Sequence, residues 1–266
     1  MPWKGGALTT ERKKQVGPEG APREGPRGGE LGAQLPLALD KRPELDFSEY
    51  LPGPNAEGVA AIHAWAQATT AAEGNRFLYL FGPPGTGKTH LLQAACGAAR
   101  KVGLAAAYLP LNHPGLNPAI LDELESLDRI ALDALDAIAG IPAWEQALFH
   151  LYNRLRQAKR GLLVAARRPT AELGARLPDL VSRLAWGPAY RLKPLDEAGC
   201  AELLRQGAQG RGLPLGEEAI AYLLKRCPRE PGYLLALLGE LDQASLAHKR
   251  RPTLPLIRNL LGTREP

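Results

Sequence analysis

Residues 82–89 read Gly82-Pro83-Pro84-Gly85-Thr86-Gly87-Lys88-Thr89 and match the pattern G-x-x-x-x-G-K-[ST] at every position. A short apolar run precedes this loop and a helical pattern follows it, which is the context that the pattern requires. Glycines let backbone N–H groups turn inward around phosphate oxygens, and the start of the helix adds its positive dipole end. The sequence therefore predicts a phosphate-binding loop (P-loop), in which Lys88 reaches the β- and γ-phosphates and the Thr89 hydroxyl holds Mg²⁺.

Strands and helices alternate around this loop. Short apolar runs predict five strands, at residues 77–81, 105–109, 129–132, 161–165 and 189–192. Helical periodicity predicts helices at residues 54–72, 88–100 and 144–159. This alternation favours an α/β fold with a parallel five-stranded sheet and right-handed crossovers.

After Pro194 the pattern becomes purely helical. Four helices are predicted, at residues 196–211, 217–226, 233–248 and 254–261, with Asp196 as the N-cap of the first. We therefore expect a core domain over residues 41–194 and a small all-α domain over residues 195–262.

Composition limits the class of protein. The hydrophobic fraction is 45%, which suffices for a core, and the net charge of +5 permits a nucleic acid or an acidic partner. No apolar run approaches the roughly 20 residues that span a bilayer, so we expect a cytoplasmic protein without membrane contact. Residues 1–33 are rich in Gly, Pro and charge and are expected to be a disordered tail. Cys96, Cys200 and Cys227 are isolated, which favours buried thiols over a metal site.

A carboxylate that holds Mg²⁺ is also expected at the end of a core strand. Asp133 ends the apolar run 130–132 and fits this position, although it could instead cap the segment that follows. Enzymes of this type usually carry a second acidic residue next, to orient the attacking water, and here that residue is Ala134. Asp136 lies two residues further on and is expected to point elsewhere once the strand has ended.

Three segments carry a resemblance to a known family. They read DALDAIAG at 133–140, PAWEQALFHLYN at 142–153 and LPDLVSRLAWG at 177–187. With the P-loop they closely resemble the Hda family, regulatory inactivators of the bacterial replication initiator DnaA, over about residues 34–261. The resemblance implies an AAA+ core with a helical lid, and ADP or ATP with Mg²⁺ as cofactors. It also implies a negative regulator of replication initiation, which makes DnaA hydrolyse its own ATP while attached to the DNA-loaded sliding clamp.

The resemblance assigns roles to individual residues. Arg183 corresponds to an arginine finger, a guanidinium placed in trans on a γ-phosphate; the alternative is a surface salt bridge. Residues 34–40 resemble the clamp-binding peptide, with Gln34, Leu35, Leu37 and Leu39 as its contacts. The alternative for this segment is a first strand or a staple of the fold.

The segment 51–55 resembles the loop that lines the adenine pocket in this family, which assigns Pro54 and Asn55 to the nucleotide site. A turn that leads into the next helix is the alternative.

The sequence departs from the family at positions that assist hydrolysis. Ala134 replaces the second acid, residues 165–167 lack a polar Ser, Thr or Asn, and Gly232 stands where many relatives carry a sensing Arg, with Arg229 nearby. We therefore expect a regulatory protein that binds a nucleotide and has weak or no intrinsic ATPase activity. AAA+ proteins often contact each other at the finger edge, so a homo-oligomer is possible.

Other functions remain open at this point. An AAA+ helicase loader and an autonomous P-loop ATPase share the core features, whereas a DNA-binding initiator would need a further helix-turn-helix domain after the lid. Direct DNA binding is a further alternative to DNA contact through the clamp. Its candidate surface would consist of Arg154, Arg156, Lys159, Arg160, Arg167 and Arg168.

Overall fold

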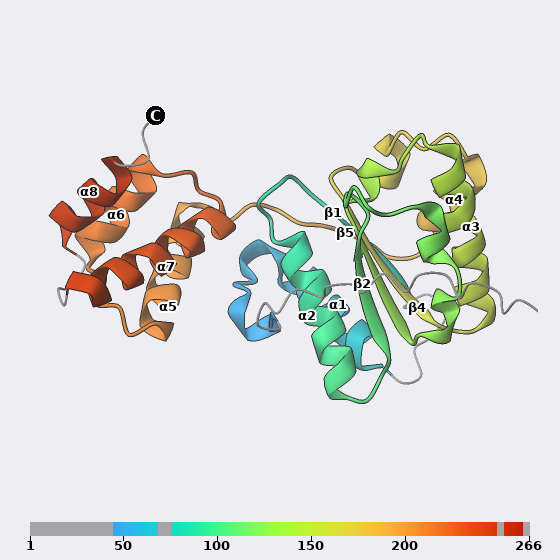
Figure 1. Ribbon diagram of the computed structural model, residues 1–266, viewed down its shortest axis with the longest axis horizontal. Coiled ribbons are helices and arrows are strands. Elements are labelled where there is room, and N and C mark those ends of the chain that lie inside the picture. Colours follow the sequence, from blue (N-terminus) through green and yellow to red (C-terminus); the bar gives the residue numbers. More distant parts are fainter. Residues whose placement is uncertain (1–44, 69–75, 249–252, 263–266) are drawn as a thin grey trace, which may run out of the picture. The chain divides into compact units, whose positions relative to one another are not determined.

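The computed structural model describes residues 45–68, 76–248 and 253–262 (Figure 1). The expected tail at 1–33 and the expected clamp-binding peptide at 34–40 lie outside the described residues, as do Gln34, Leu35, Leu37 and Leu39.

Five parallel strands form one sheet in the order β2-β3-β4-β1-β5. They are β1 (Phe77–Phe81), β2 (Ala106–Pro110), β3 (Arg129–Asp133), β4 (Gly161–Ala166) and β5 (Ala189–Arg191). The predicted α/β fold with a parallel sheet is confirmed, and each strand lies within one residue of its predicted bounds. Because all strands run in one direction, the residues that follow β1, β3 and β4 meet at the same edge of the sheet.

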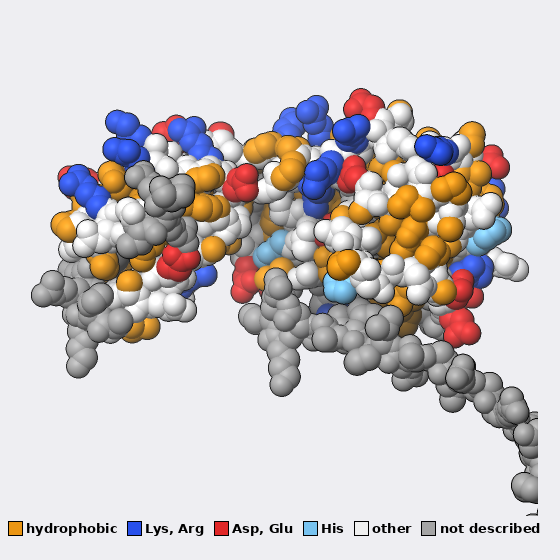
Figure 2. Space-filling view, turned by 45° about the horizontal axis from the view of Figure 1, so that its top comes forward, with side chains coloured by type: hydrophobic (Ala, Val, Ile, Leu, Met, Phe, Trp, Pro, Cys, Tyr) orange, Lys and Arg blue, Asp and Glu red, His pale blue; other side chains and the backbone are white. Residues whose placement is uncertain are grey.

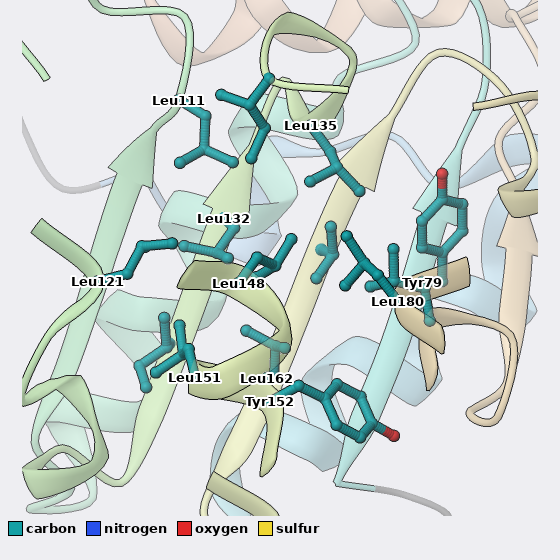
Figure 3. Close-up of a cluster of buried hydrophobic side chains, with 14 of the residues drawn as sticks. Tyr79, Leu111, Leu121, Leu132, Leu135, Leu148, Leu151, Tyr152, Leu162 and Leu180 are labelled. Atoms are coloured by element: carbon teal, nitrogen blue, oxygen red, sulfur yellow. The ribbon is translucent and has the colours of Figure 1, made fainter. Parts of the chain in front are cut away.

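Helices cover both faces of the sheet (Figure 1). On one face α1 (Ala56–Gln67) and α2 (Lys88–Lys101) pack against Leu163 and Ala165 of β4. On the other face α3 (Pro142–Gln157) and α4 (Pro178–Leu184) pack against the alternate residues of the sheet, including Leu162 of β4 (Figure 3). Since successive side chains of a strand point to opposite faces, both faces of this central sheet are apolar.

The helix bounds differ from prediction where prolines and turns intervene. α1 begins at Ala56 because residues 53–55 form a short 3₁₀ turn, and it ends at Gln67, before the predicted residue 72. α3 begins at Pro142 because proline fits the first turn, where its missing N–H is not needed. Short 3₁₀ turns at Pro118–Leu121 and Leu124–Ser126 fill the connection from β2 to β3, for which no element was predicted.

The C-terminal helices form a core of their own. They are α5 (Glu197–Gly210), α6 (Glu217–Arg226), α7 (Pro231–His248) and α8 (Leu254–Gly262). Asp196 caps α5 as predicted, because its Oδ1 accepts a hydrogen bond from the Gly199 N–H at 2.8 Å. Cys200 and Cys227 are buried in this domain and Cys96 in the first, which confirms their prediction as buried thiols. Within the described ranges, no helix has the length and apolar character needed to cross a membrane.

Candidate functional site

A pocket of about 450 Å³ lies where the carboxyl ends of β1, β3 and β4 meet. Several predicted site residues line it: Asn55, Pro84, Gly85, Thr86, Gly87, Lys88, Thr89 and Asp133. Gly82, Pro83 and Pro54 are not among its lining residues, and Pro54 is exposed. The C-terminal domain contributes Leu203, Pro231 and Leu235, together with Gly232 at the position where a sensing Arg was expected. Arg229 instead pairs with Glu197, at 2.9 Å, within its own domain.

The loop needs its glycines for separate reasons. Gly85 and Gly87 have φ angles of 78° and 81°, a left-handed conformation that side chains disfavour. At Gly82 an added Cβ would lie 2.4 Å from the carbonyl oxygen of Leu192, so there is no room for a side chain. The backbone can therefore curl tightly at the start of α2 and direct N–H groups toward the pocket.

The Lys88 side chain lies inside the loop. Its Nζ donates hydrogen bonds to the carbonyl oxygens of Gly82 at 2.7 Å and Pro83 at 2.8 Å. Burial lowers the pKa of Lys88, whereas the negative charges of Asp133 and Asp136 oppose this shift. The backbone thus fixes a cation inside the loop that the sequence predicts to bind phosphate.

Thr89 and Asp133 come together as predicted for a Mg²⁺ site. The Thr89 hydroxyl donates to Oδ2 of Asp133 at 2.5 Å, and the Tyr108 phenol donates to the same oxygen at 3.0 Å. Hydroxyl and carboxylate oxygens are the ligands that Mg²⁺ prefers, so these residues fit the ion. Oδ1 of Asp133 also accepts from the Ala134 N–H at 2.8 Å, but Asp133 does not cap the next turn, whose N-cap is Ala134. Burial, and then the charge of Asp133, raise the pKa of Tyr108.

Asp136 lies along the pocket wall, so the expectation that it points elsewhere was wrong. After Ala134, which has a left-handed φ of 56°, the chain makes a 3₁₀ turn over Leu135–Ala137. This turn brings the carboxylate back, and its Oδ2 accepts from the backbone N–H of Arg167 at 2.7 Å. Arg167 follows β4 and also lines the pocket, whereas Ala134 provides no carboxylate beside Asp133.

Asn55 and Tyr50 hold the segment before α1 against the P-loop. The buried Asn55 amide accepts from the Lys193 N–H at 2.8 Å and donates to the Lys193 carbonyl at 2.9 Å. The Tyr50 phenol donates to the Thr86 carbonyl at 3.0 Å, and its ring covers Gly87 so closely that an added Cβ would lie 2.6 Å from it. The sequence did not predict this role of Tyr50, because the sequence shows only an aromatic residue within a charged stretch.

Arg183 lies on α4 and is partly exposed, and it does not line the pocket of its own chain. Its guanidinium carbon is 5.4 Å from the ring centroid of Trp186, and that of Arg156 is 5.0 Å from the same ring. Trp186 is 63% exposed. We call these three residues the Trp186 cluster. In the part of the chain that the structure describes, Arg183 has no carboxylate partner, so the salt-bridge alternative finds no support there.

Glu145 fixes the loop that leads into α4. It is only 2% exposed, and its carboxylate accepts from the backbone N–H groups of Gly140 at 2.6 Å, Arg176 at 3.0 Å and Leu177 at 2.8 Å. One side chain at the start of α3 thus anchors two loops, including the one just before Pro178. No sequence signal pointed to this residue.

Four of the basic residues named as a candidate DNA surface have other contacts or positions in the structure. Arg154 binds Glu125 at 3.0 Å, and Arg160 binds Asp128. Arg167 belongs to the pocket and Arg156 to the Trp186 cluster. On the face of the core seen in Figure 2, hydrophobic side chains form a broad area with Lys and Arg side chains beside it.

Comparison with known proteins identifies the C-terminal domain. Residues 196–261 match the family model described as "Hda, lid domain". The second domain resembles the Hda lid. This match, together with the fold of the first domain, confirms the predicted resemblance to the Hda family.

Most of the chain is similar in fold to solved structures of replication initiators. Domain III of the Thermotoga maritima replication initiation protein DnaA matches with a TM-score of 0.70 and 20% identity, covering 84% of this chain and 97% of that one. AMPPCP-bound DnaA from Aquifex aeolicus matches with a TM-score of 0.64 and 21% identity, covering 76% and 66%. The Thermotoga maritima Holliday junction motor RuvB matches with a TM-score of 0.64 and 17% identity, covering 84% and 72%. An α/β core with a parallel sheet, followed by a helical domain that matches the Hda lid, is thus shown, as predicted.

Proposed function

We propose that this protein is a nucleotide-binding negative regulator of DNA replication initiation, which stimulates ATP hydrolysis by the initiator DnaA. The Hda lid and the DnaA-like core support a regulator related to the initiators. AAA+ proteins of this kind contact one another at their nucleotide sites, so a DnaA-like core suits a DnaA partner.

The pocket of this chain holds a nucleotide in the proposed function. Backbone N–H groups of the loop and Lys88 bind its phosphates, and Thr89 and Asp133 hold Mg²⁺. The ion, when bound, neutralises phosphate charge. Hydrolysis in this pocket is slow because Ala134 offers no carboxylate to orient a water molecule next to Asp133.

The position of Arg183 carries the proposal for stimulation. Its guanidinium lies on an exposed aromatic ring, outside its own pocket and without a carboxylate partner among the described residues. Such a group is available to a second nucleotide site, where it neutralises the charge that develops on the γ-phosphate. An arginine finger in trans accelerates hydrolysis by about 10³- to 10⁵-fold.

The sliding clamp is the second proposed partner. Residues 34–40 would bind it as an extended peptide, with Gln34 at the rim of a pocket and Leu37 and Leu39 inside it. Attachment to a clamp loaded on DNA raises the local concentration of the regulator near DNA-bound DnaA without any new contact.

The decisive experiment measures hydrolysis of DnaA-bound ATP with and without this protein, in the presence and absence of DNA-loaded clamp. We expect stimulation that requires Arg183 and is lost in Arg183→Ala. Arg205→Ala is the matched control, because Arg205 is an exposed lid residue paired with Glu217 and far from α4 in sequence. Deletion of residues 34–39 should remove the dependence on the clamp.

Two outcomes would contradict the proposal. If Arg183→Ala stimulates as well as the unchanged protein, the finger assignment is wrong. If DnaA does not respond at all and the protein instead binds the replicative helicase, a helicase loader replaces the regulator.

A further inference from the structure

Tyr108 lies behind the proposed Mg²⁺ site, and the proposed function gives it no role. Its phenol donates to Oδ2 of Asp133 at 3.0 Å, the oxygen that also accepts from the Thr89 hydroxyl at 2.5 Å. Thr89 and Asp133 line the pocket, whereas Tyr108 is not among its lining residues. The phenol therefore contacts a candidate ligand of the ion and not the space in which a nucleotide would lie.

The register of the sheet explains why this phenol reaches Asp133. Tyr108 of β2 pairs with Ala131 of β3, and both lie on the face of the sheet that α1 and α2 cover. Asp133 is two residues further along β3, so its side chain points to the same face, roughly 7 Å from that of Ala131. Because Ala131 is small, it leaves room for the tyrosine ring, whose hydroxyl then meets the carboxylate at the end of the strand.

Three donors hold the Asp133 carboxylate. Oδ2 accepts from the Thr89 and Tyr108 hydroxyls, and Oδ1 accepts from the Ala134 N–H at 2.8 Å. Asp133 is only 7% exposed, so water has little access to replace a lost donor. Thr89 is itself a candidate ligand, and Ala134 is the chain neighbour of Asp133. Tyr108 is the donor that links the carboxylate to another strand, and such outer hydrogen bonds orient the ligands of a metal ion.

We propose that Tyr108 is a positioning residue of the Mg²⁺ site, and that its hydrogen bond to Asp133 favours Mg²⁺ over the larger Ca²⁺. The inference rests on the ion binding in the proposed function and goes beyond it, because it concerns which ion the site prefers. Mg²⁺ requires a near-ideal octahedral arrangement of oxygens, whereas Ca²⁺ accepts irregular ones. A carboxylate that loses an outer hydrogen bond can rotate, so the affinity for Mg²⁺ should fall more than the affinity for Ca²⁺.

The test is binding of AMPPCP by the purified full chain, measured by calorimetry with Mg²⁺, with Ca²⁺ and with EDTA. Tyr108→Phe removes the phenol oxygen and keeps the ring. We expect the gain in AMPPCP affinity from Mg²⁺ to fall by about tenfold, the low end for the loss of an outer hydrogen bond to a metal ligand. The gain from Ca²⁺ should fall by about twofold or less, because Ca²⁺ tolerates a rotated carboxylate. The affinity in EDTA should not change.

Tyr79→Phe is the matched control. Its phenol lies on the core strand β1, donates to the Arg168 carbonyl at 2.8 Å and is not among the residues that line the pocket. This variant should keep the gain from Mg²⁺. A second comparison sets Asp133→Ala against the double variant that also carries Tyr108→Phe. Without the carboxylate the phenol has nothing to position, so these two variants should depend on Mg²⁺ equally.

Several outcomes would overturn this inference and leave the proposed function intact. They are an equal fall of the gains from Mg²⁺ and Ca²⁺, an unchanged gain from Mg²⁺ in Tyr108→Phe, and the same loss in Tyr79→Phe. A lower affinity in EDTA would also overturn it, because Tyr108 would then support the fold of the pocket and not the ion. If Mg²⁺ gives the unchanged protein no gain, the ion site of the proposed function fails as well. Thermal unfolding of each variant verifies that it is folded.

Discussion

The pocket and the Trp186 cluster both contain positively charged side chains, but they are built in different ways. In the pocket, backbone carbonyls of Gly82 and Pro83 hold the Lys88 ammonium. In the cluster, two guanidinium groups lie against an exposed ring. A cation–π contact leaves the N–H donors of arginine free, whereas the two carbonyls take two of the three N–H donors of Lys88. The difference teaches that one cation is fixed by polar backbone atoms, whereas the other two lie against an aromatic ring that leaves their donors available.

The strongest test of this contrast removes each of the two cations in turn and measures both nucleotide affinity and stimulation of DnaA. Lys88→Ala should lower nucleotide affinity of this protein by about 100-fold, because a charge-assisted contact to phosphate is lost. Arg183→Ala should keep that affinity and lower stimulation of DnaA by about 10³-fold. Calorimetry and single-turnover hydrolysis measure the two effects. The contrast breaks if Arg183→Ala weakens nucleotide binding by its own chain.

The next largest effect concerns the support of α4. Glu145→Ala removes the acceptor of three backbone N–H groups, and we expect the free energy of unfolding to fall by about 3 kcal/mol. Glu145→Gln keeps one acceptor oxygen and should lose less. Urea unfolding measures both, with the exposed Glu172→Ala as the control.

Glu145→Gln also tests the comparison between the pocket and the Trp186 cluster. Because Glu145 anchors the loop before α4, folded Glu145→Gln should lose stimulation of DnaA while it retains nucleotide affinity. A loss of nucleotide affinity with normal stimulation would show that Glu145 supports the pocket instead.

A smaller effect is expected at the Mg²⁺ ligands. Thr89→Val removes the hydroxyl that meets Asp133, so the gain in nucleotide affinity from Mg²⁺ should shrink by about tenfold. Titrations with Mg²⁺ and with EDTA measure this gain. Affinity without the ion should stay unchanged; a drop there would mean that Thr89 serves the loop rather than the ion.

The smallest expected effect concerns the ring under Arg183. A cation–π contact at an exposed site contributes about 0.5–1 kcal/mol, so Trp186→Ala should lower stimulation by about two- to fivefold. Trp186→Phe keeps an aromatic face and should restore part of it. Equal rates for Ala and Phe would show that the ring does not hold the finger.

Much of the fold followed from local pattern. The strands of the core are short apolar runs beside helices with clear periodicity, and the P-loop fixes its own geometry through Gly85, Gly87 and Lys88. Asp133 was predictable because it ends such a run. α4 was not predicted because seven residues are too few for a helical period to show.

The contacts of the site that the sequence did not predict join residues that are distant along the chain. Asn55 meets Lys193 across 138 residues of sequence, and Glu145 reaches Arg176 and Leu177 through the packing of α3 against α4. Asp136 was placed wrongly because its return to the pocket depends on a left-handed Ala134, which no sequence pattern indicates. Such features follow from tertiary geometry, not from spacing along the chain.

The double hydrogen bond between Asn55 and Lys193 has a mechanical consequence. The Asn55 amide binds both the N–H and the carbonyl of Lys193, as a neighbouring strand would. These two hydrogen bonds restrict the backbone torsions of Lys193. Any rotation of the C-terminal helices against this segment would therefore have to use torsions after Lys193, where the ring of Pro194 already fixes one φ. Tyr50 of the same short segment donates to the Thr86 carbonyl. A displacement of this segment would therefore move both Lys193 and the P-loop.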